Sequence, residues 1–331
     1  MHINRIALCL ALVASSLVSP VTSASNLRNT ARKLRNPKSL ECTIVITSDY
    51  RDLEVASANF EEEGFECVLD PSDADGISNL SFPIIASVAQ KQVLKEKLNK
   101  GELISDHSTL LFGNGVQLSA DGVHVPPGLE IALGKRPNKD RRLAVLTGDK
   151  PILVVKVTDS VGKARVESPA VISSDVFSDA LNLKSQMHAC SFGQLNIVPG
   201  DTSFDPDADP VAAPGVIEVT ISITLEGNSR AAIRNAVTTA VQAKLGTNLP
   251  GPYQQVIYVL ENCYLDCGWA AYAYVNSWNS VFQSAYYKHV GVQMHELGHN
   301  FNLAHSGGLD GATYTDHTGY VSCLFSNEFL F

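Results

Sequence analysis

The sequence has no block of like charge, and its 331 residues carry a formal net charge of −9 at pH 7. Nucleic acids and anionic membrane surfaces attract clustered Lys and Arg, so neither is expected as a partner. Internal repeats and low-complexity segments are also lacking, which argues against repeat architectures. With 45% hydrophobic and 18% charged residues, the composition is that of a globular protein with a substantial core, and the length favours two domains.

Long apolar runs are scarce as well. After residue 18, no segment is long enough and apolar enough to cross a membrane. The run 6–18 is itself short. It follows Arg5 and precedes small residues, which is the order found in secretory signal peptides. A buried N-terminal helix is the alternative interpretation. We expect residues 1–24 to be removed by cleavage after Ser23 or Ala24, leaving a secreted protein with no membrane insertion.

The cysteine count agrees with secretion. Removal of Cys9 with the signal peptide leaves six cysteines, Cys42, Cys67, Cys190, Cys263, Cys267 and Cys323. An even number in an oxidising compartment predicts disulfides. The first two form a natural local pair. The fourth and fifth can pair with each other, or either can pair with the third. Asn79, in "NLS", is the one glycosylation sequon.

Residues 25–150 are expected to form a small α/β prodomain. The sequence pattern places a strand at 42–47, helices at 52–65 and 86–101, and further strand and turn signals at 108–113 and 121–128.

A polar stretch at 134–151 follows, with the dibasic pairs Lys135–Arg136 and Arg141–Arg142. Between two folded halves of a secreted protein, such a stretch is either a processing site or a solvated loop, and the sequence leaves both open.

Residues 151–331 are expected to form an α+β domain. Candidate strands lie at 152–157, 194–198, 215–225, 255–260 and 268–276. Candidate helices lie at 175–189, at 228–246 and from about 290 onward. The helix at 228–246 is the clearest, because Asn228 or Ser229 can cap its start and Gly246 can end it.

One acidic run, "DPDADP" at 205–210, alternates Asp with other residues in the manner of a calcium loop. The EF-hand pattern requires Gly at loop position six and Glu at position twelve, where this chain has Pro210 and Val216. A turn-rich surface loop is the favoured interpretation.

The motif "HELGHNFNLAH" at 295–305 contains the candidate metal ligands and the candidate general base. His295 and His299 are four residues apart, so a helix places both imidazoles on one face where they can reach a single metal ion. Glu296 is rotated about 100° around the helix from His295. It is therefore poorly placed as a further ligand but can reach a water molecule on the metal.

His305 requires a change of backbone direction. In a continued helix it would lie about 9 Å beyond His299 along the axis, too far to share an ion. The helix must therefore end between them, and Asn302 is a residue that tolerates the left-handed conformation of such a turn.

Three neutral imidazoles with one open position are typical of a catalytic zinc site. Zinc polarises a carbonyl and acidifies bound water, and Glu296 would act as the general base. The pattern predicts peptide hydrolysis without a covalent intermediate. The alternative is a helix with surface histidines, and the other six histidines have no comparable neighbours.

Together, "CSFGQLNIVPGD" (190–201), "CGWAAYAYVNSWNSVF" (267–282) and "HELGHNFNLAHS" (295–306) resemble the gametolysin family, peptidase M11, with a metzincin zinc signature carrying Asn in place of the usual Gly. The resemblance spans roughly residues 150–319. It implies a metzincin-like fold, a mixed twisted sheet with two long helices and the zinc site on the second. It also implies a secreted zymogen with zinc on His295, His299 and His305 and Glu296 as catalyst, acting on extracellular-matrix or cell-wall glycoproteins. We expect a monomer.

Two further expectations follow from the resemblance. The strand 270–275 precedes the zinc helix and is either the sheet edge that binds substrate backbone or an ordinary core strand. For zymogen control, a prosegment cysteine can ligate the zinc. Cys42 and Cys67 are the candidates, although a disulfide between them is favoured.

The chain departs from the family after the motif. "DHTG" at 316–319 should lead into a Met-containing turn, but no Met follows Met294, and a C-terminal segment that walls the substrate pocket is lacking. The tail after Gly319 is expected to be either a shifted frame, retained intron or truncated product, or the end of a genuine shortened paralogue. The competing function is therefore a secreted, non-catalytic zinc-binding protein.

Overall fold

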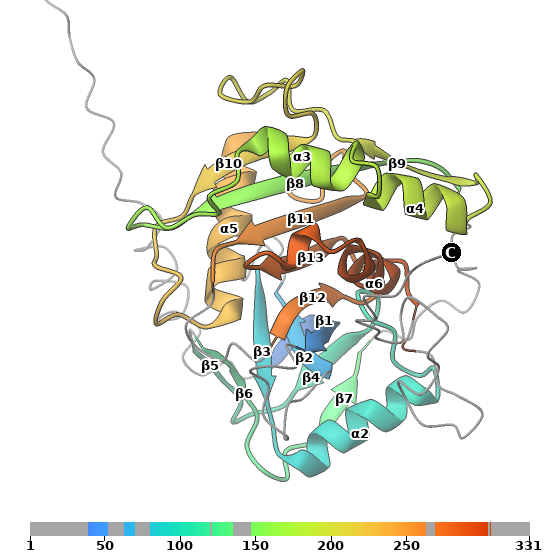
Figure 1. Ribbon diagram of the computed structural model, residues 1–331. Coiled ribbons are helices and arrows are strands. Elements are labelled where there is room, and N and C mark those ends of the chain that lie inside the picture. Colours follow the sequence, from blue (N-terminus) through green and yellow to red (C-terminus); the bar gives the residue numbers. More distant parts are fainter. Residues whose placement is uncertain are drawn as a thin grey trace, which may run out of the picture.

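The computed structural model describes residues 39–51, 63–69, 80–119, 121–134, 147–262, 269–303 and 305. The described part of the chain is a mixed α+β protein with one large mixed sheet (Figure 1). The elements before residue 135 are β1 (Leu40–Arg51), β2 (Glu63–Val68), β3 (Ser81–Ile85), α2 (Val88–Asn99), β4 (Thr109–Phe112), β5 (Gln117–Ser119), β6 (Gly122–His124) and β7 (Ile131–Leu133).

The elements after residue 146 include six strands and four α-helices within the described residues. They are β8 (Gly148–Thr158), α3 (Pro169–Phe177), α4 (Leu183–Cys190), β9 (Leu195–Pro199), β10 (Val216–Thr220), α5 (Arg230–Leu245), β11 (Gln255–Leu260), β12 (Trp269–Tyr274), β13 (Asn279–Gln283), the short 3₁₀ turn η1 (Tyr286–Lys288) and α6 (Val290–Asn300).

A single sheet joins the two halves of the chain. Its order is β10-β8-β11-β13-β12-β1-β2-β3-β6-β5, with β9 paired to β8 and with β4 paired to β1 and β7. Strands β10, β8, β11 and β13 are parallel, whereas β12 runs antiparallel to β13. On its other side β12 pairs antiparallel with β1, so the first strand continues the sheet of the second half.

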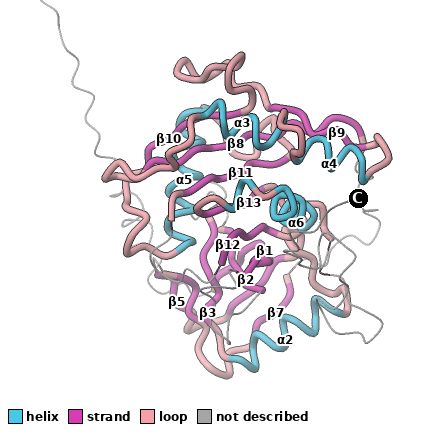
Figure 2. The backbone as a smooth tube through the Cα atoms, viewed as in Figure 1, coloured by secondary structure: helices cyan, strands magenta, loops and turns pink. Residues whose placement is uncertain are grey.

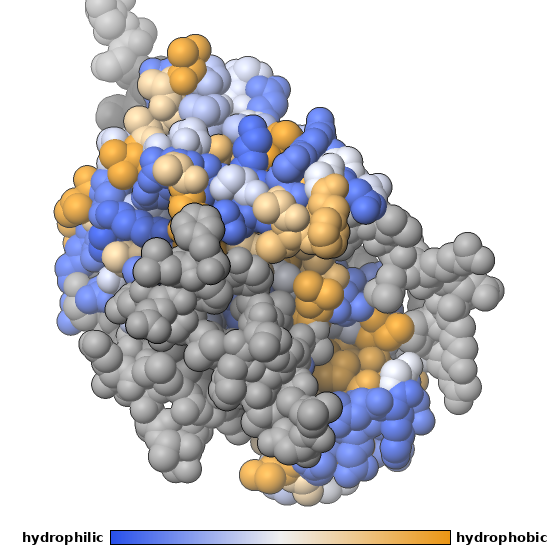
Figure 3. All heavy atoms as spheres, turned by 45° about the vertical axis from the view of Figure 1, so that its right-hand side comes forward, coloured by the Kyte–Doolittle hydropathy of each residue, from blue (hydrophilic) through white to orange (hydrophobic). Residues whose placement is uncertain are grey.

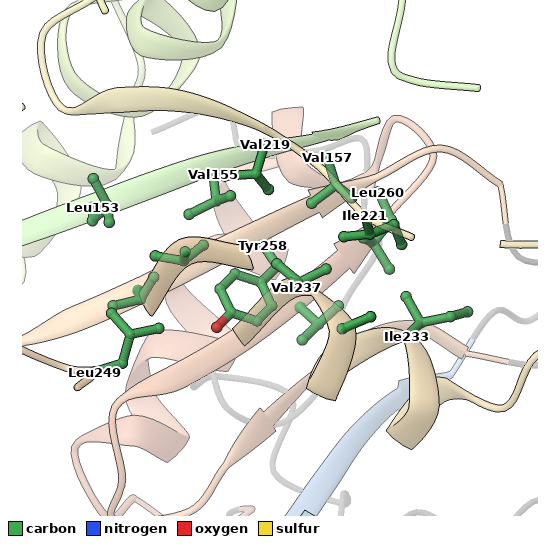
Figure 4. Close-up of a cluster of buried hydrophobic side chains, with 14 of the residues drawn as sticks. Leu153, Val155, Val157, Val219, Ile221, Ile233, Val237, Leu249, Tyr258 and Leu260 are labelled. Atoms are coloured by element: carbon green, nitrogen blue, oxygen red, sulfur yellow. The ribbon is translucent and has the colours of Figure 1, made fainter. Parts of the chain in front are cut away.

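Helices cover both faces of the C-terminal part of the sheet (Figures 1 and 2). Helix α5 packs on one face, where its Val237 lies beside Tyr258 of β11 and its Ile233 belongs to the same apolar cluster (Figure 4). Helices α3, α4 and α6 pack on the other face in a second apolar cluster. Strands buried between two helical layers have apolar side chains on both faces, which explains the continuous apolar runs of β8 and β11.

Helix α5 forms where its capping residues predict it. The Ser229 side chain accepts a hydrogen bond from the Ala232 N–H, and Gly246 ends the helix in the left-handed conformation at φ 72°. Ile233, Val237 and Val241 recur every four residues and form its buried stripe. These contacts confirm the helix and select Ser229 from the two candidate caps.

Most of the other predicted elements that fall on described residues are confirmed. The structure contains the strands predicted at 42–47, 152–157 and 255–260, and the helices predicted at 86–101 and from about 290. It also forms the disulfide between Cys42 and Cys67.

Three predicted elements are wrong in extent or type. The helix predicted at 175–189 is two helices, because Asn182 accepts from the Ser185 N–H and starts α4 afresh. The helix predicted at 52–65 conflicts with β2, whose side chains Phe65 and Cys67 are buried on β1; residues 52–62 lie outside the described part. The strand predicted at 215–225 ends at Thr220, and the following residues turn toward α5.

Other expectations fall outside the described residues. These are the signal peptide, the sequon at Asn79, both dibasic pairs, Cys263, Cys267 and Cys323, and the tail after Gly319. Cys190 is exposed. None of the described helices has the length and apolar character that a bilayer crossing requires. Hydrophilic residues gather at the lower right of the molecule in the view of Figure 3, and in the polar helix α2 Leu94 is the one buried residue.

The core on the α5 side can be tested at Leu153, which is fully buried between the sheet and α5. We expect Leu153→Ala to lower the free energy of unfolding by roughly 2–5 kcal/mol, through lost burial and the cavity left behind. Urea unfolding followed by circular dichroism measures the change. The matched control is Leu181→Ala, since Leu181 is 59% exposed. An equal loss in both variants would contradict this description of the core.

Candidate metal centre

Helix α6 carries the first two histidines of the motif. Met294 and Leu297 are buried in the apolar cluster that also contains α3 and α4, and they fix the rotation of the helix. His295 and His299 lie one turn apart and are 0% and 1% exposed. The apolar anchors therefore direct both imidazoles to the same place inside the protein.

Ion pairs hold the segment that leads into α6. Lys288 Nζ lies 2.6 Å from a carboxylate oxygen of Glu167, and Arg165 contacts both Glu167 and Glu261. Burial opposes ionisation of Glu167, but the hydrogen bonds from Arg165 and Lys288 lower its pKa to about 2. Glu167 thus remains ionised at neutral pH, and its ion pairs hold the segment that precedes the helix.

Helix α6 ends between His299 and His305, as is required if His305 is to lie near the other two histidines. Asn302 has φ 67°, in the left-handed region. The N–H of Asn302 donates to the carbonyl of His299 at 2.8 Å, and the N–H of Leu303 donates to that of Gly298 at 2.9 Å. These two bonds define a Schellman motif with Asn in the usual glycine position. The predicted turn is therefore confirmed, and the chain reverses after one left-handed residue.

The reversal brings the three imidazoles together. His295 Nε2 lies 3.0 Å from His299 Nε2 and 3.3 Å from His305 Nε2. Two ligand nitrogens of a tetrahedral zinc ion, each about 2.05 Å from the metal, lie about 3.3 Å apart. Among the described residues, these histidines form the one group of three or more potential ligands that can share an ion.

The orientation and charge state of the rings suit metal binding. His299 Nδ1 lies 2.8 Å from the carbonyl oxygen of Leu303, which can only accept, so Nδ1 holds the proton and Nε2 keeps its lone pair. Burial lowers the pKa of His299 to about 4. Burial, together with the neighbouring His299, lowers the pKa of His305 to about 3. Both rings are therefore neutral at pH 7, the form that binds metals.

Glu296 is buried beside this cluster and is 0% exposed. No described residue hydrogen-bonds either of its carboxylate oxygens. Burial and then the charge of Asp49 raise its pKa well above the usual range. A buried carboxyl without a protein partner needs water or an ion nearby. A cation held by the three histidines would favour its ionised form, so the residues present fit a divalent metal.

The site includes residues of β1 that the sequence pattern did not indicate. Ser48 Oγ lies 3.2 Å from His305 Nε2, and the Tyr50 ring meets the His295 ring edge-on with centroids 4.9 Å apart. The neighbouring Asp49 forms an ion pair with Arg230 of α5. No local motif marks these positions, because only the pairing of β1 with β12 brings them to the site.

The acidic run at 205–210 forms a turn-rich loop, as favoured. Asp205 accepts from Lys244 of α5, and Asp209 Oδ1 accepts from the N–H groups of Val211 and Ala212. Within the described chain, no metal-ligand group includes these aspartates. Their carboxylates stabilise the loop backbone.

Comparison with known proteins agrees with the geometry. Residues 160–322, about half of the chain, match the model of the family described as gametolysin peptidase M11. Members of this family are metallopeptidases. No curated protein and no solved structure matched the chain. The matched range contains all three histidines and Glu296.

Substitution at Asn302 tests the reversal. A β-branched residue at φ 67° costs about 1–2 kcal/mol, so we expect Asn302→Val to weaken zinc binding about 5- to 30-fold. Asn302→Gly is the matched control and should bind zinc as the natural chain does, because glycine adopts this conformation without strain. Zinc titration against a chromophoric chelator measures both affinities. Equal affinities for the Val and Gly variants would show that the turn does not position His305.

Proposed function

We propose that this chain, which belongs to the gametolysin peptidase M11 family over residues 160–322, is a secreted zinc metalloendopeptidase. The family implies a protease and a protein substrate. Zinc, Glu296 as general base and an extracellular setting are our proposals. One observation carries them, namely the convergence of three imidazole nitrogens beside a buried carboxyl that no described residue hydrogen-bonds.

The three histidines and Glu296 have separate roles in the proposed reaction. His295, His299 and His305 would hold the ion through Nε2 and leave room for a fourth ligand. When bound, zinc polarises the scissile carbonyl and lowers the pKa of water to about 7. The Glu296 carboxylate accepts the proton of the attacking water and delivers it to the leaving amine nitrogen. Burial excludes bulk water from the carboxylate, so the proton remains available for that transfer.

Extracellular-matrix or cell-wall glycoproteins are the proposed substrates. The support for the location lies in the N-terminal sequence order of a signal peptide and in the Cys42–Cys67 disulfide. Disulfides persist in oxidising compartments and are rare in the cytosol. The support for the substrate class is the family resemblance.

A non-catalytic zinc-binding protein is the competing proposal. It rests on the residues that follow "DHTG" at 316–319, because Tyr320, Val321 and Ser322 stand where the family resemblance places a Met-containing turn. Zinc bound at one equivalent without cleavage by the processed chain would favour this alternative.

The general base is tested by Glu296→Gln, which preserves the shape of the side chain but removes its basicity. We expect cleavage of a quenched fluorescent peptide library to fall at least about 100-fold, the lower range for loss of a positioned general base. Zinc content, measured by atomic absorption, should stay at one equivalent. The assay uses protein cut within residues 135–146 by a protease specific for basic residues.

Two controls make the result specific. His299→Ala should lose both zinc and cleavage, because one of the three ligands is removed. A chelator should abolish cleavage by the natural chain, and added zinc should restore it. Retained cleavage by Glu296→Gln would refute the assigned base.

A further inference from the structure

Strand β12 is the strand of the second half that lies next to the first half in the sheet. It pairs with β13 on one side, and its other side is covered by β1 from the first half. Without β1, β12 would present its backbone groups as a free edge, which is a template for another extended chain. The register runs antiparallel from Thr47 opposite Tyr274 to Tyr50 opposite Ala271.

The paired part of β1 crosses the metal centre. Successive side chains of a strand point to opposite faces, and the contacts follow this alternation. Ser48 and Tyr50 face the metal site, where they contact His305 and His295. Asp49 faces the other way and pairs with Arg230. Consecutive residues of β1 therefore contact groups on both faces of the sheet beside β12.

Tyr50 is buried within the apolar cluster that surrounds α6. Its aromatic ring thus occupies space that belongs to the second half of the protein, next to a candidate ligand. The disulfide leaves neither Cys42 nor Cys67 as a thiolate to ligate zinc. Ser48 and Tyr50 in the body of β1 therefore connect the first half with the candidate ligands.

We propose that β1 is a built-in peptide ligand of the catalytic cleft, and that Thr47–Tyr50 occupies along β12 the place of an extended substrate. The proposal rests on the proposed peptidase function and adds its regulation. The backbone of a substrate would pair with the β12 edge, a bulky aromatic side chain would fill the space of Tyr50, and an acidic side chain would meet Arg230. While β1 is in place, the full chain is latent.

The test weakens the attachment of β1 to the second half in the full chain and leaves the three candidate metal ligands unchanged. Asp49→Ala combined with Tyr50→Ala removes one contact on each face of the cleft. We expect the double variant to lose its bound zinc to 1,10-phenanthroline about tenfold faster than the natural chain, which corresponds to about 1.4 kcal/mol. Hydrogen exchange of the β12 amides should accelerate in parallel, and cleavage of the quenched peptide library should rise.

The matched control is Glu41→Ala, an exposed position on the same strand where β1 pairs with β4 rather than β12. It should match the natural chain in every measurement. Hydrogen exchange of β4 and β6 checks that the first half remains folded. A second variant, Ser48→Pro, removes a backbone donor from the β1 segment beside β12 and should act like the double variant.

The outcomes separate the two proposals. Unchanged zinc loss in both the double variant and Ser48→Pro would overturn the assignment of β1 as the cover of the site. Faster zinc loss and faster β12 exchange without any cleavage would support the cover but contradict the peptidase function. Cleavage by the natural full chain at the rate of the variants would retain the peptidase function and refute latency.

A peptide with the sequence Thr-Ser-Asp-Tyr-Arg, residues 47–51, provides an independent measurement. It should inhibit the double variant competitively, and a scrambled peptide of the same composition should not. Equal inhibition by the two peptides would show that the cleft does not recognise the order of side chains seen in β1.

Discussion

The candidate metal centre depends on one left-handed residue, Asn302. If Asn302 continued the helix, His305 would move away from His295 and His299, and no three described imidazoles would share an ion. The two backbone hydrogen bonds that close the turn satisfy carbonyls at the end of α6, so the reversal also caps the helix. Asparagine tolerates this conformation better than most residues because its short polar side chain can hydrogen-bond locally. The same turn places the Leu303 carbonyl against His299 Nδ1 and so fixes the tautomer that directs Nε2 inward.

The reversal brings the three imidazoles together because packing fixes the rotation of α6 about its own axis. Met294 and Leu297 pack into the cluster shared with α3 and α4, and ion pairs hold the segment before the helix. Such packing also explains why Glu296 is buried. A helix with the two histidines on one side and apolar anchors on the other leaves the Glu296 carboxylate between the two, away from bulk solvent. The raised pKa of Glu296 is the electrostatic consequence of this position.

Short-range features of the sequence predicted the local structure well. Three features depend only on residues that are close together in the sequence. They are the spacing of His295, His299 and His305, the caps of α5, and the apolar runs of β8 and β11. The break between α3 and α4 was missed because Asn182 competes locally with helix continuation, and apolar periodicity does not reveal that competition. The contacts of Ser48 and Tyr50 with the histidines join residues more than 240 positions apart in the chain. Such contacts depend on the register of two strands, which no local pattern specifies.

The contact between the two halves is polar as well as extended, and this bears on its role. Asn235 of α5 exchanges two hydrogen bonds with the backbone of Ser81, and the Tyr274 hydroxyl donates to Glu66. Burial and the nearby Glu66 raise the pKa of Tyr274 well above its usual range, which keeps the hydroxyl protonated as a donor. Buried polar pairs are costly unless geometry is good, so they favour one register of β1 on β12 over its alternatives. On separation, water can replace the partners of these groups. Separation of a purely apolar contact would instead expose a large hydrophobic surface that promotes aggregation. A polar, strand-paired contact is therefore suited to a cover that is specific while attached and can be removed without leaving the second half prone to aggregation.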